Sequence, residues 1–444
     1  VEEGWKYDSN VLARFLGRGV PTPTHGSSAF VTVGSEYAHD YTDIRIPNGS
    51  TTAQVQINAA IDFLSNTYNG GTVYVGKGTY KTSAAIVMKS NIHLQLDSKA
   101  TIEKNGNFNG ITATGGSGTE LTGIKISGGK ITRNAADTNA KQLILFTYVD
   151  DSEISGCLLY DGYDNPLKLS SCDNTRITEC TIDTCNGYGI YITGGSVNTS
   201  ILNNTIKNVT NGSGIFISNS ADNETRIVSN VIHTVVSTSA TDYAGIESRG
   251  GSVKTIVTSN TIHTLSASST GQLWGIKLIA PDSVIQGNII HTMVHTGTNN
   301  VSGIDISAER ITADDNAISG ITVNNGASAG GANGIFIPAD ESSVVNNAIT
   351  DITITAGSGT ARGIWVFTGK DGSCVQGNRI NTVDDIGVDV DGSYNTITGS
   401  TIDGVVTGIN IGASATGTIV DLNGVQNASG NAFLDAGTNT IIGG

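Results

Sequence analysis

A four-residue segment, Gly-Ile-x-Ile or a close variant, recurs along about half of the chain and limits the folds that the sequence can adopt. It begins at nine glycines spaced 21 to 31 residues apart, namely Gly189, Gly214, Gly245, Gly275, Gly303, Gly334, Gly363, Gly387 and Gly408. Repeats of this length are typical of solenoids, in which each unit buries its apolar face against its neighbours.

The repeated segments are short, Gly-rich and β-branched, which favours strands over helices. A second segment, Asn-x-Ile, follows each of the earlier copies, so a repeat contains at least two strands. Alternation along a strand places Ile190 and Ile192 inside and Tyr191 outside. We therefore predict an all-β chain that folds as a right-handed parallel β-helix of about 11–13 coils.

The asparagines of the second segment form a column of their own: Asn204, Asn230, Asn260, Asn288, Asn316, Asn347 and Asn378. Stacked amides can hydrogen-bond one another and the turn backbone, so we predict an internal ladder at a bend. Cys157 and Cys180 occupy the same place in earlier coils. We expect the five cysteines to be buried free thiols.

Composition excludes several classes of function. The chain has 39 acidic and 24 basic residues, a net charge of −15, which argues against nucleic acid as a partner. No apolar run approaches the about 18 residues of a membrane span, so we expect no membrane insertion. Cysteines and histidines lack metal-ligand spacing, and we expect no metal and no other cofactor.

Residues 51–66 precede the repeats and carry apolar side chains at helical spacing: Val55, Ile57, Ala60, Ile61 and Leu64. We expect a helix with Thr51 or Thr52 as its N-cap. The predicted division is an N-terminal arm or stem at 1–47, a capping helix and first strand at 48–85, and the β-helix at 86–444.

The order of these motifs resembles the opening of the pectate-lyase-like superfamily, through QINAAID, GGTVYV, GTY and SNIHL…ATI between residues 51 and 104. That family includes phage tailspike depolymerases, polygalacturonases, alginate epimerases and surface β-helix proteins. The resemblance implies that the helix caps the solenoid end and that the ligand is a polysaccharide. It also implies an extracellular place, on a virion tail or cell surface, and a homotrimer as one assembly.

The chain departs from the family at its known catalytic motifs. Asn48-Gly49-Ser50 replaces the usual GDG…DD run, and no paired-Asp motif with Gly-His-Gly is present. Where alginate epimerases carry a DPHE-like motif, this chain reads from Tyr163 to Lys168 and keeps only Asp164 and Pro166. Epimerase activity is therefore not expected from the resemblance.

The outward position of the Gly-Ile-x-Ile strands defines a column of candidate site residues. In chain order it reads Tyr191, Phe216, Glu247, Lys277, Asp305, Phe336, Trp365, Asp389 and Asn410, with Lys168 one coil earlier. Charged residues occupy the middle and aromatic residues lie on both sides. Aromatic rings stack on sugar rings and carboxylates transfer protons, so this order fits a bound glycan chain.

Glu247 and Asp305 are the predicted catalytic pair. They are two coils apart, about 9–10 Å at the backbone. Inverting glycosidases hold their carboxyls about 6.5–9.5 Å apart and retaining ones about 5–5.5 Å, so inversion is the nearer fit. Lys277 lies between the two and is expected to lower the pKa of both, which counts against an acid role.

Further substrate contacts are expected beside this pair. Arg249 lies two residues past Glu247 on the same face. The long turns before the strands form a rim that carries Tyr243 and Trp274, with Asp242 as an additional catalytic carboxylate. A second column of His233, His263 and His291 is interpreted as a polar turn column and not as a metal site.

Three functions remain open. The first is an endo-acting glycoside hydrolase of a tailspike or secreted depolymerase. The second is a non-catalytic glycan-binding adhesin or structural surface protein, in which Glu247, Lys277 and Asp305 form only a cross-strand ion-pair ladder. The third is a polysaccharide lyase or epimerase, in which Lys277 or Arg249 would act.

Overall fold

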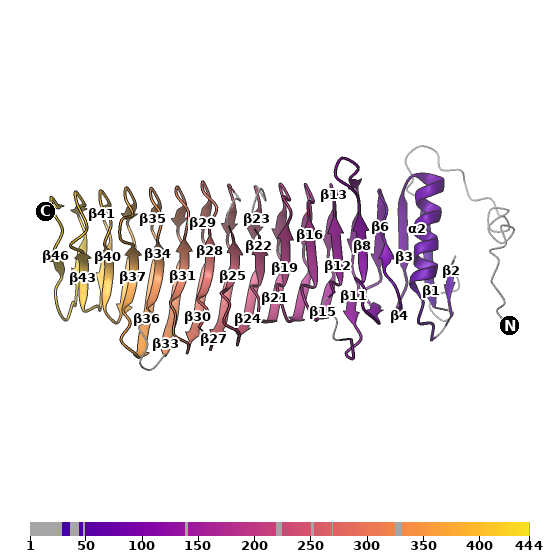
Figure 1. Ribbon diagram of the computed structural model, residues 1–444, viewed down its shortest axis with the longest axis horizontal. Coiled ribbons are helices and arrows are strands. Elements are labelled where there is room, and N and C mark those ends of the chain that lie inside the picture. The colour runs from indigo at the N-terminus through magenta and orange to yellow at the C-terminus, as the bar shows by residue number, and fades with distance from the viewer. Residues whose placement is uncertain are drawn as a thin grey trace.

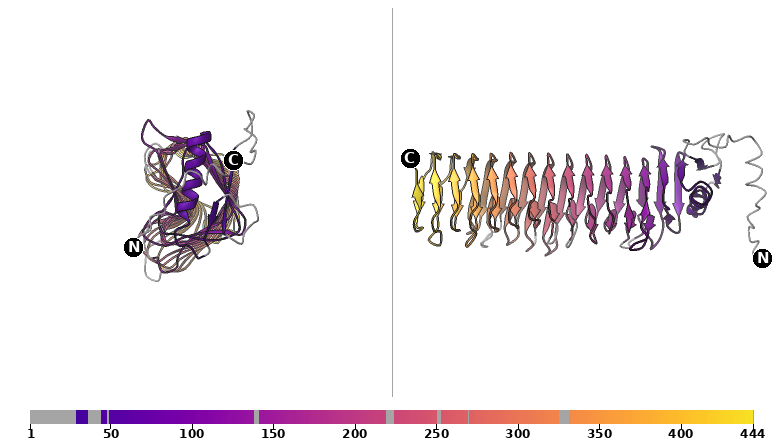
Figure 2. Two further views of the ribbon diagram at one scale, coloured as in Figure 1. Left: turned by 90° about the vertical axis from the view of Figure 1, so that its right-hand side faces the viewer. Right: turned by 90° about the horizontal axis from the view of Figure 1, so that it is seen from above.

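The computed structural model of the chain is one elongated stack of coils in which three parallel sheets run along the axis (Figure 1). It describes residues 29–35, 44–47, 49–137, 141–218, 224–249, 253–268, 270–324 and 331–443. Each complete coil contributes one strand to each sheet, and the predicted parallel β-helix is confirmed. Viewed along the axis, the coils lie over one another and the helix lies across one end (Figure 2).

Sheet C contains the Gly-Ile-x-Ile strands and has 14 strands in the described residues. They are β5 (Ile86–Val87), β8 (Ile111–Thr114), β12 (Ile144–Thr147), β16 (Leu167–Ser170), β19 (Ile190–Thr193), β22 (Ile215–Ile217), β25 (Tyr243–Ser248), β28 (Leu273–Leu278), β31 (Val301–Ile306), β34 (Ala332–Ile337), β37 (Ala361–Val366), β40 (Ile386–Val390), β43 (Thr407–Ile411) and β46 (Phe433–Asp435).

Sheet B follows the asparagine column and also has 14 described strands. They are β4 (Gly78–Thr82), β7 (Ala100–Lys104), β11 (Lys130–Arg133), β15 (Leu158–Gly162), β18 (Thr181–Cys185), β21 (Thr205–Thr210), β24 (Val231–Ser237), β27 (Thr261–Ala267), β30 (Ile289–His295), β33 (Ala317–Asn324), β36 (Ala348–Ala356), β39 (Arg379–Val383), β42 (Thr401–Asp403) and β45 (Gly424–Gln426).

Sheet A precedes the asparagine column and has 17 described strands. They are β1 (Phe30–Ser35), β2 (Ile44–Ile46), β3 (Gly71–Val75), β6 (Ile92–Leu96), β10 (Lys125–Ser127), β14 (Glu153–Ser155), β17 (Arg176–Thr178), β20 (Ser200–Leu202), β23 (Arg226–Val228), β26 (Ile256–Thr258), β29 (Val284–Gln286), β32 (Thr312–Asp314), β35 (Ser343–Val345), β38 (Cys374–Gln376), β41 (Thr396–Thr398), β44 (Ile419–Asp421) and β47 (Ile441–Ile442). A small pair, β9 (Leu121–Thr122) and β13 (Val149–Asp150), lies outside the three sheets.

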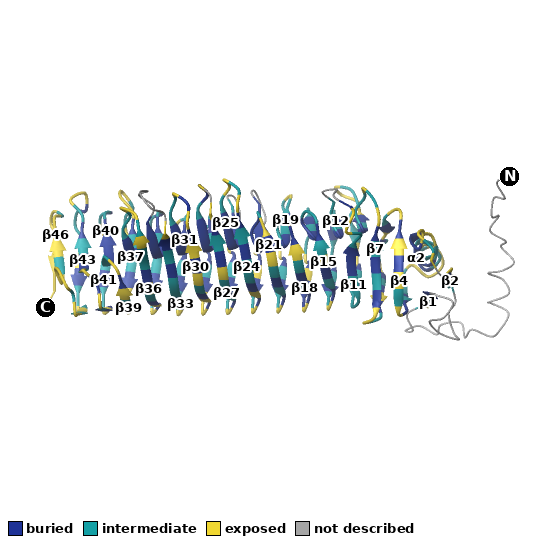
Figure 3. Cartoon of the chain, turned by 90° about the horizontal axis from the view of Figure 1, so that it is seen from below, coloured by how far each residue is buried: buried dark blue, intermediate teal, exposed yellow. Residues whose placement is uncertain are grey.

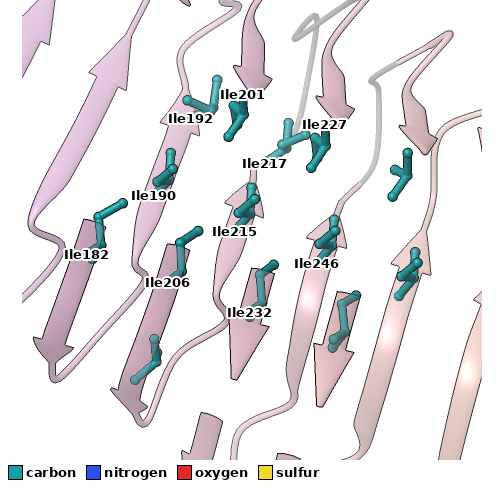
Figure 4. Packing of buried hydrophobic residues seen from close by; sticks show 14 of the residues in the cluster. Ile182, Ile190, Ile192, Ile201, Ile206, Ile215, Ile217, Ile227, Ile232 and Ile246 are labelled. Atoms are coloured by element: carbon teal, nitrogen blue, oxygen red, sulfur yellow. The ribbon is translucent and has the colours of Figure 1, made fainter. Parts of the chain in front are cut away.

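The core is a continuous column of isoleucine and valine side chains inside the coils. One coil places Ile206 of sheet B, Ile215 and Ile217 of sheet C and Ile227 of sheet A in it, all fully buried (Figure 4). Buried and more exposed positions alternate along most strands (Figure 3), as a strand with one inner face requires.

The repeat glycines are needed because sheets B and C approach closely at this point. A Cβ added to Gly245 would lie 2.5 Å from Cγ2 of Ile262 and 2.8 Å from the carbonyl oxygen of Gly275. The same pair of contacts recurs in neighbouring coils. The glycine column is therefore a packing requirement of the narrow solenoid.

The predicted asparagine ladder is confirmed. Nδ2 of Asn260 donates to Oδ1 of Asn288 at 2.9 Å and to the carbonyl oxygen of Ile227 at 2.9 Å. The backbone N–H of Asn260 donates to the same Oδ1 at 3.0 Å. Cys180 continues the column, because its N–H donates to Oδ1 of Asn204. The ladder links successive coils through buried amides.

The N-terminal helix α2 (Gln54–Tyr68) packs beside β1 and β3 at one end of the stack. The predicted caps are wrong: the N-cap is Ala53, and no side chain caps the helix. Val55 is exposed, and Gln54 is buried in its place because its amide bonds both Oγ and N–H of Ser83. The first turn of the helix therefore buries Gln54 and not Val55.

Strands β1 and β2 lie within the segment predicted as an arm. Both are parallel additions to sheet A: β1 pairs with β3, and β2 pairs with β1. The division at residues 47 and 85 stays a prediction, and residues 1–28 and 36–43 lie outside the described part of the chain. All five cysteines are free, as expected. Four are buried, but the expectation of burial is wrong for Cys374, which is partly exposed. In the described residues no helix has the length and apolarity needed to cross a membrane.

Candidate functional site

The predicted outward column of sheet C is one continuous register across ten strands. Lys168 is paired with Tyr191, Tyr191 with Phe216, and Phe216 with Glu247. The pairing continues in order through Lys277, Asp305, Phe336, Trp365, Asp389 and Asn410. Adjacent members are therefore one strand spacing apart, about 4.8 Å.

Glu247 lies at the centre of this column and has no exposed surface. Its Oε1 accepts a hydrogen bond from Nε of Arg249 at 2.5 Å, and its Oε2 accepts one from Oγ of Ser213 at 2.8 Å. Burial raises the pKa of Glu247, and Arg249, Ser213 and Lys277 only partly oppose this effect. The carboxyl is thus desolvated and held from two sides.

Asp305, two strands further along, is 3% exposed. It accepts a hydrogen bond from Oγ of Ser307. Burial raises the pKa of Asp305, while Ser307, Lys277 and Trp274 lower it and the charge of Glu247 raises it. Lys277 lowers the pKa of both carboxyls, as expected, but desolvation outweighs the lysine, and the pKa of each carboxyl is raised.

Lys277 stands between the two carboxyls and packs on an aromatic ring. Its Nζ is 3.5 Å from the ring centroid of Trp274, within the range of a cation–π contact. The residue is half-buried, and no salt bridge to Lys277 occurs among the described residues. Its charge therefore stays available on the outer face.

An aromatic cluster lies on the N-terminal side of the carboxyls. The ring of Phe216 stacks on Tyr188 at 4.1 Å and lies 5.5 Å from Tyr191. Arg249 packs over the ring of Phe216 at 5.3 Å. Phe216 points outward as predicted, but the expectation that it is exposed is wrong: these neighbours leave it 5% exposed. Tyr188 and Tyr191 form the accessible part of the cluster.

A second aromatic cluster lies on the C-terminal side. The ring centroids of Phe336 and Trp365 are 4.8 Å apart, and Phe367 meets both edge-on at 5.7 and 5.1 Å. The indole N–H of Trp365 donates to Oδ2 of Asp391 at 3.0 Å. Arg362 packs on Trp365 at 4.1 Å from its centroid. This cluster is half-buried to exposed, and Phe367 is 39% exposed.

Tyr243 and Trp274 do not lie on turns as predicted. They belong to β25 and β28 and are 2% and 1% exposed, because sheet C extends towards the N-terminus of each repeat segment. Asp242 lies just before β25, and its Oδ1 accepts the backbone N–H of Gln272 at 2.9 Å. Asp242 is near enough to Arg249 to affect the pKa of that guanidinium.

Several site residues were missed by the analysis of the sequence: Tyr188, Ser213, Ser307, Arg362 and Phe367. Three of them directly precede a repeat glycine, as does Trp274. This position is a second column on sheet C, in which Trp274 pairs with Ser302, Ser302 with Asn333, and Asn333 with Arg362. The residue before each repeat glycine is therefore the signal that could have found Tyr188, Ser213 and Arg362.

The three histidines stack on the outside of sheet B. Ring centroids of His233 and His263, and of His263 and His291, are 5.0 Å apart and nearly parallel. The interpretation as a turn column is wrong, because they lie within β24, β27 and β30. In the described residues no group of three or more His, Cys, Asp or Glu side chains could hold a metal ion.

Comparison with known proteins finds the same architecture. Residues 79–232 match the family described as right handed beta helix region. A tailspike protein mutant of E. coli bacteriophage HK620, solved with a pentasaccharide, has a TM-score of 0.54 and 12% identity. The similarity covers 93% of this chain and 80% of the tailspike chain. A hexasaccharide complex of another mutant of that tailspike gives a TM-score of 0.55 at the same identity and coverage.

A surface adhesin of Streptococcus pneumoniae, PfbA, is a third solved structure with similarity to this chain. Its TM-score is 0.44 at 15% identity, over 87% of this chain and 91% of its own. A search of curated proteins finds no significant match. At 12% identity, the similarity to the tailspike structures shows a shared fold only. The three parallel sheets, together with the family match over residues 79–232, show that the chain has the right-handed parallel β-helix fold.

Proposed function

We propose that the outer face of sheet C binds a long extracellular polysaccharide and that the carboxyl groups at its centre cleave the chain by hydrolysis. The observation that carries the proposal is the order on this face. Two aromatic clusters lie on either side of two desolvated carboxyls, Glu247 and Asp305, in one register.

Binding rests on the two aromatic clusters. Sugar rings stack on aromatic faces, and half-buried rings on a rigid sheet lose little conformational freedom when they bind. Tyr191 and Trp365 are separated by six strand spacings, about 29 Å. A ligand that contacts both clusters must be an extended oligomer, which favours an internal segment of a long chain.

Cleavage rests on the carboxyls. A general acid must keep its proton near neutral pH, and burial raises the pKa of Asp305 in that direction. Two strand spacings separate Asp305 from Glu247, which is closer to the geometry of inverting glycosidases than of retaining ones. In the proposal Asp305 is the acid, and Glu247 or the more accessible Asp242 is the base.

The proposal has a direct test. The protein is incubated with purified bacterial capsular and O-antigen polysaccharides, and product size is followed by gel filtration. The wild type is expected to shorten one of them, with inversion at the anomeric carbon seen by NMR. Asp305→Asn is expected to abolish shortening without loss of binding. If Asp305→Asn, Glu247→Gln and Asp242→Asn all shorten the chain normally, the assigned site is wrong.

A non-catalytic adhesin or structural surface protein is the second candidate, and one observation favours it. Glu247 has no exposed surface, and both of its oxygens already bond to protein groups. In this function Glu247 only holds Arg249 against Phe216. Tight binding of a polysaccharide that keeps its full length after prolonged incubation would select this candidate. Formation of an unsaturated product would instead select a lyase.

The proposed setting is the outside of a cell or a virion tail. It is supported by the fold shared with a tailspike that was solved with an oligosaccharide. Assembly as a homotrimer is part of the same proposal. Sedimentation of the purified chain, or light scattering, tests that assembly independently of any glycan.

A further inference from the structure

The outer face of sheet C carries four cations, each packed on an aromatic ring. Nζ of Lys168 is 4.8 Å from the centroid of Tyr191, and Nζ of Lys277 is 3.5 Å from that of Trp274. The guanidinium carbons of Arg249 and Arg362 are 5.3 and 4.1 Å from the centroids of Phe216 and Trp365. A cation fixed in this way loses little side-chain entropy when it meets a ligand.

The carboxylates of the same face lie deeper than the cations. In the ion pair of Arg249 with Glu247, the side chains are 43% and 0% exposed. In that of Arg362 with Asp389 they are 16% and 4% exposed. In both pairs the positive group is the one that reaches the surface.

The remaining acidic groups of the face are also engaged by protein donors. Asp305 accepts from Ser307, Asp242 from the backbone of Gln272, and Asp391 from the indole of Trp365. Asn410 donates a further bond to Asp389. Their charges are satisfied from inside the protein, so that the groups offered outward are mainly ammonium and guanidinium.

The centre of the face, around Glu247, carries two of these four cations. Lys277 lies in β28 and Arg249 directly follows the adjacent strand β25, and both act on the buried Glu247. Among the described residues Lys277 has no ion pair, and the terminal nitrogens of Arg249 have no hydrogen-bond partner. Two partly exposed cations that both act on one buried carboxyl fit the oxygens of a carboxylate or a sulfate on a ligand.

We infer that the polysaccharide recognised by this face is anionic and that Lys277 and Arg249 bind an acidic group of one sugar at the centre. Lys168 lies four strand spacings from Lys277, about 19 Å, and contacts a second acidic group further along the chain. The inference rests on the proposed function. It is opposite to what the net charge of −15 suggests, because selection of the ligand depends on the local face.

The experiment compares matched probes. Binding is measured by biolayer interferometry with a panel of uronate-containing, sialylated and sulfated polysaccharides, and with neutral dextran and xylan. The best uronate binder is also tested after chemical reduction of its carboxyls to alcohols. We expect the reduced, neutral polymer to bind at least tenfold more weakly. We also expect binding of the acidic polymer to weaken as salt rises from 50 to 300 mM, since salt screens exposed charges.

Two variants and a control identify the residues. Lys277→Met keeps the apolar stem on Trp274 and removes the charge, and is expected to weaken binding of the acidic polymer at least tenfold. Arg249→Met is expected to do the same. Lys130→Met removes a cation that packs on Tyr160 at 3.9 Å on sheet B, and is expected to change nothing.

The outcomes distinguish an error in the anionic ligand from an error in polysaccharide binding itself. Binding of neutral polymers with equal affinity, or full binding by Lys277→Met, overturns the anionic ligand and leaves polysaccharide binding intact. Failure of every polymer in both classes to bind overturns the proposed function together with this inference.

Discussion

Arg249 is the only cation in direct contact with Glu247 among the described residues: its Nε lies 2.5 Å from Oε1 of that carboxylate. Glu247 is fully buried, whereas Arg249 reaches the surface. The guanidinium therefore covers the carboxyl, and any ligand that reaches Glu247 has to displace it.

Removing the cation alone should be costly. Arg249→Gln leaves a buried carboxylate without its counter-charge and is expected to lower the free energy of unfolding by about 3 kcal/mol. The double variant Glu247→Gln with Arg249→Gln should recover most of that loss, because no unpaired charge remains. Chemical denaturation of the wild type, Arg249→Gln, Glu247→Gln and the double variant gives the coupling free energy. A loss in the double variant equal to the sum of the two single losses would mean that the pair contributes nothing.

Asp305 should make stability depend on pH. Its pKa is raised by burial, so the folded state holds the proton more tightly than the unfolded state. The stabilisation is complete below the ordinary pKa of an aspartate, about 4, and is lost as pH rises through the raised value. Asp305→Asn removes this loss. The melting temperature of the variant relative to wild type is expected to rise between pH 4 and pH 8.

A flat difference across that pH range would show that burial does not perturb the pKa of Asp305.

Phe216 should contribute to stability as well as to any binding surface. It is buried beneath Tyr188, Tyr191 and Arg249, and Phe216→Ala is expected to lower the free energy of unfolding by about 3 kcal/mol. Phe216→Leu should restore part of it, because it refills much of the cavity. A loss below about 0.5 kcal/mol for Phe216→Ala would mean that the ring is not packed in solution.

Trp365 should have a larger effect on binding than on folding. It is half-buried, and Trp365→Ala is expected to weaken binding of a long polysaccharide by about 1–2 kcal/mol. Short oligosaccharides that occupy only the centre should bind unchanged. Trp365→Phe keeps an aromatic ring but loses the hydrogen bond to Asp391. This variant therefore distinguishes stacking of the ring on a sugar from the orientation that the hydrogen bond gives the ring. Unchanged affinity for the long chain in Trp365→Ala would exclude this cluster from the binding surface.

The asparagine ladder should stabilise the middle of the solenoid. Asn288→Ala removes the bonds that Nδ2 of Asn288 donates to Val257 and Asn316. It also removes the Oδ1 that accepts from the backbone N–H and Nδ2 of Asn260. We expect a loss of about 1–3 kcal/mol in the free energy of unfolding, measured by denaturant titration. Asn381→Ala, on the outer side of sheet B, is the control and should be nearly neutral. Similar values for both variants would contradict the ladder's role.

The fold and the register of the site could be predicted from the sequence because both follow from short-range periodicity. Two-residue alternation decides which side chains of a Gly-Ile-x-Ile strand face the core, and the repeat decides which strands are neighbours. The order from Lys168 to Asn410 and the asparagine ladder were predicted in this way, and the structure confirms them.

The state of each outward side chain was decided only by the tertiary structure. Whether Phe216 is exposed depends on Tyr188, 28 residues earlier in the chain, and on Arg249, 33 residues later. Whether Glu247 and Asp305 keep their protons depends on desolvation, which is set by the neighbours of several coils and has no sequence period. Alternation determines the direction of a side chain, and packing between coils determines its burial, its charge state and therefore its chemistry.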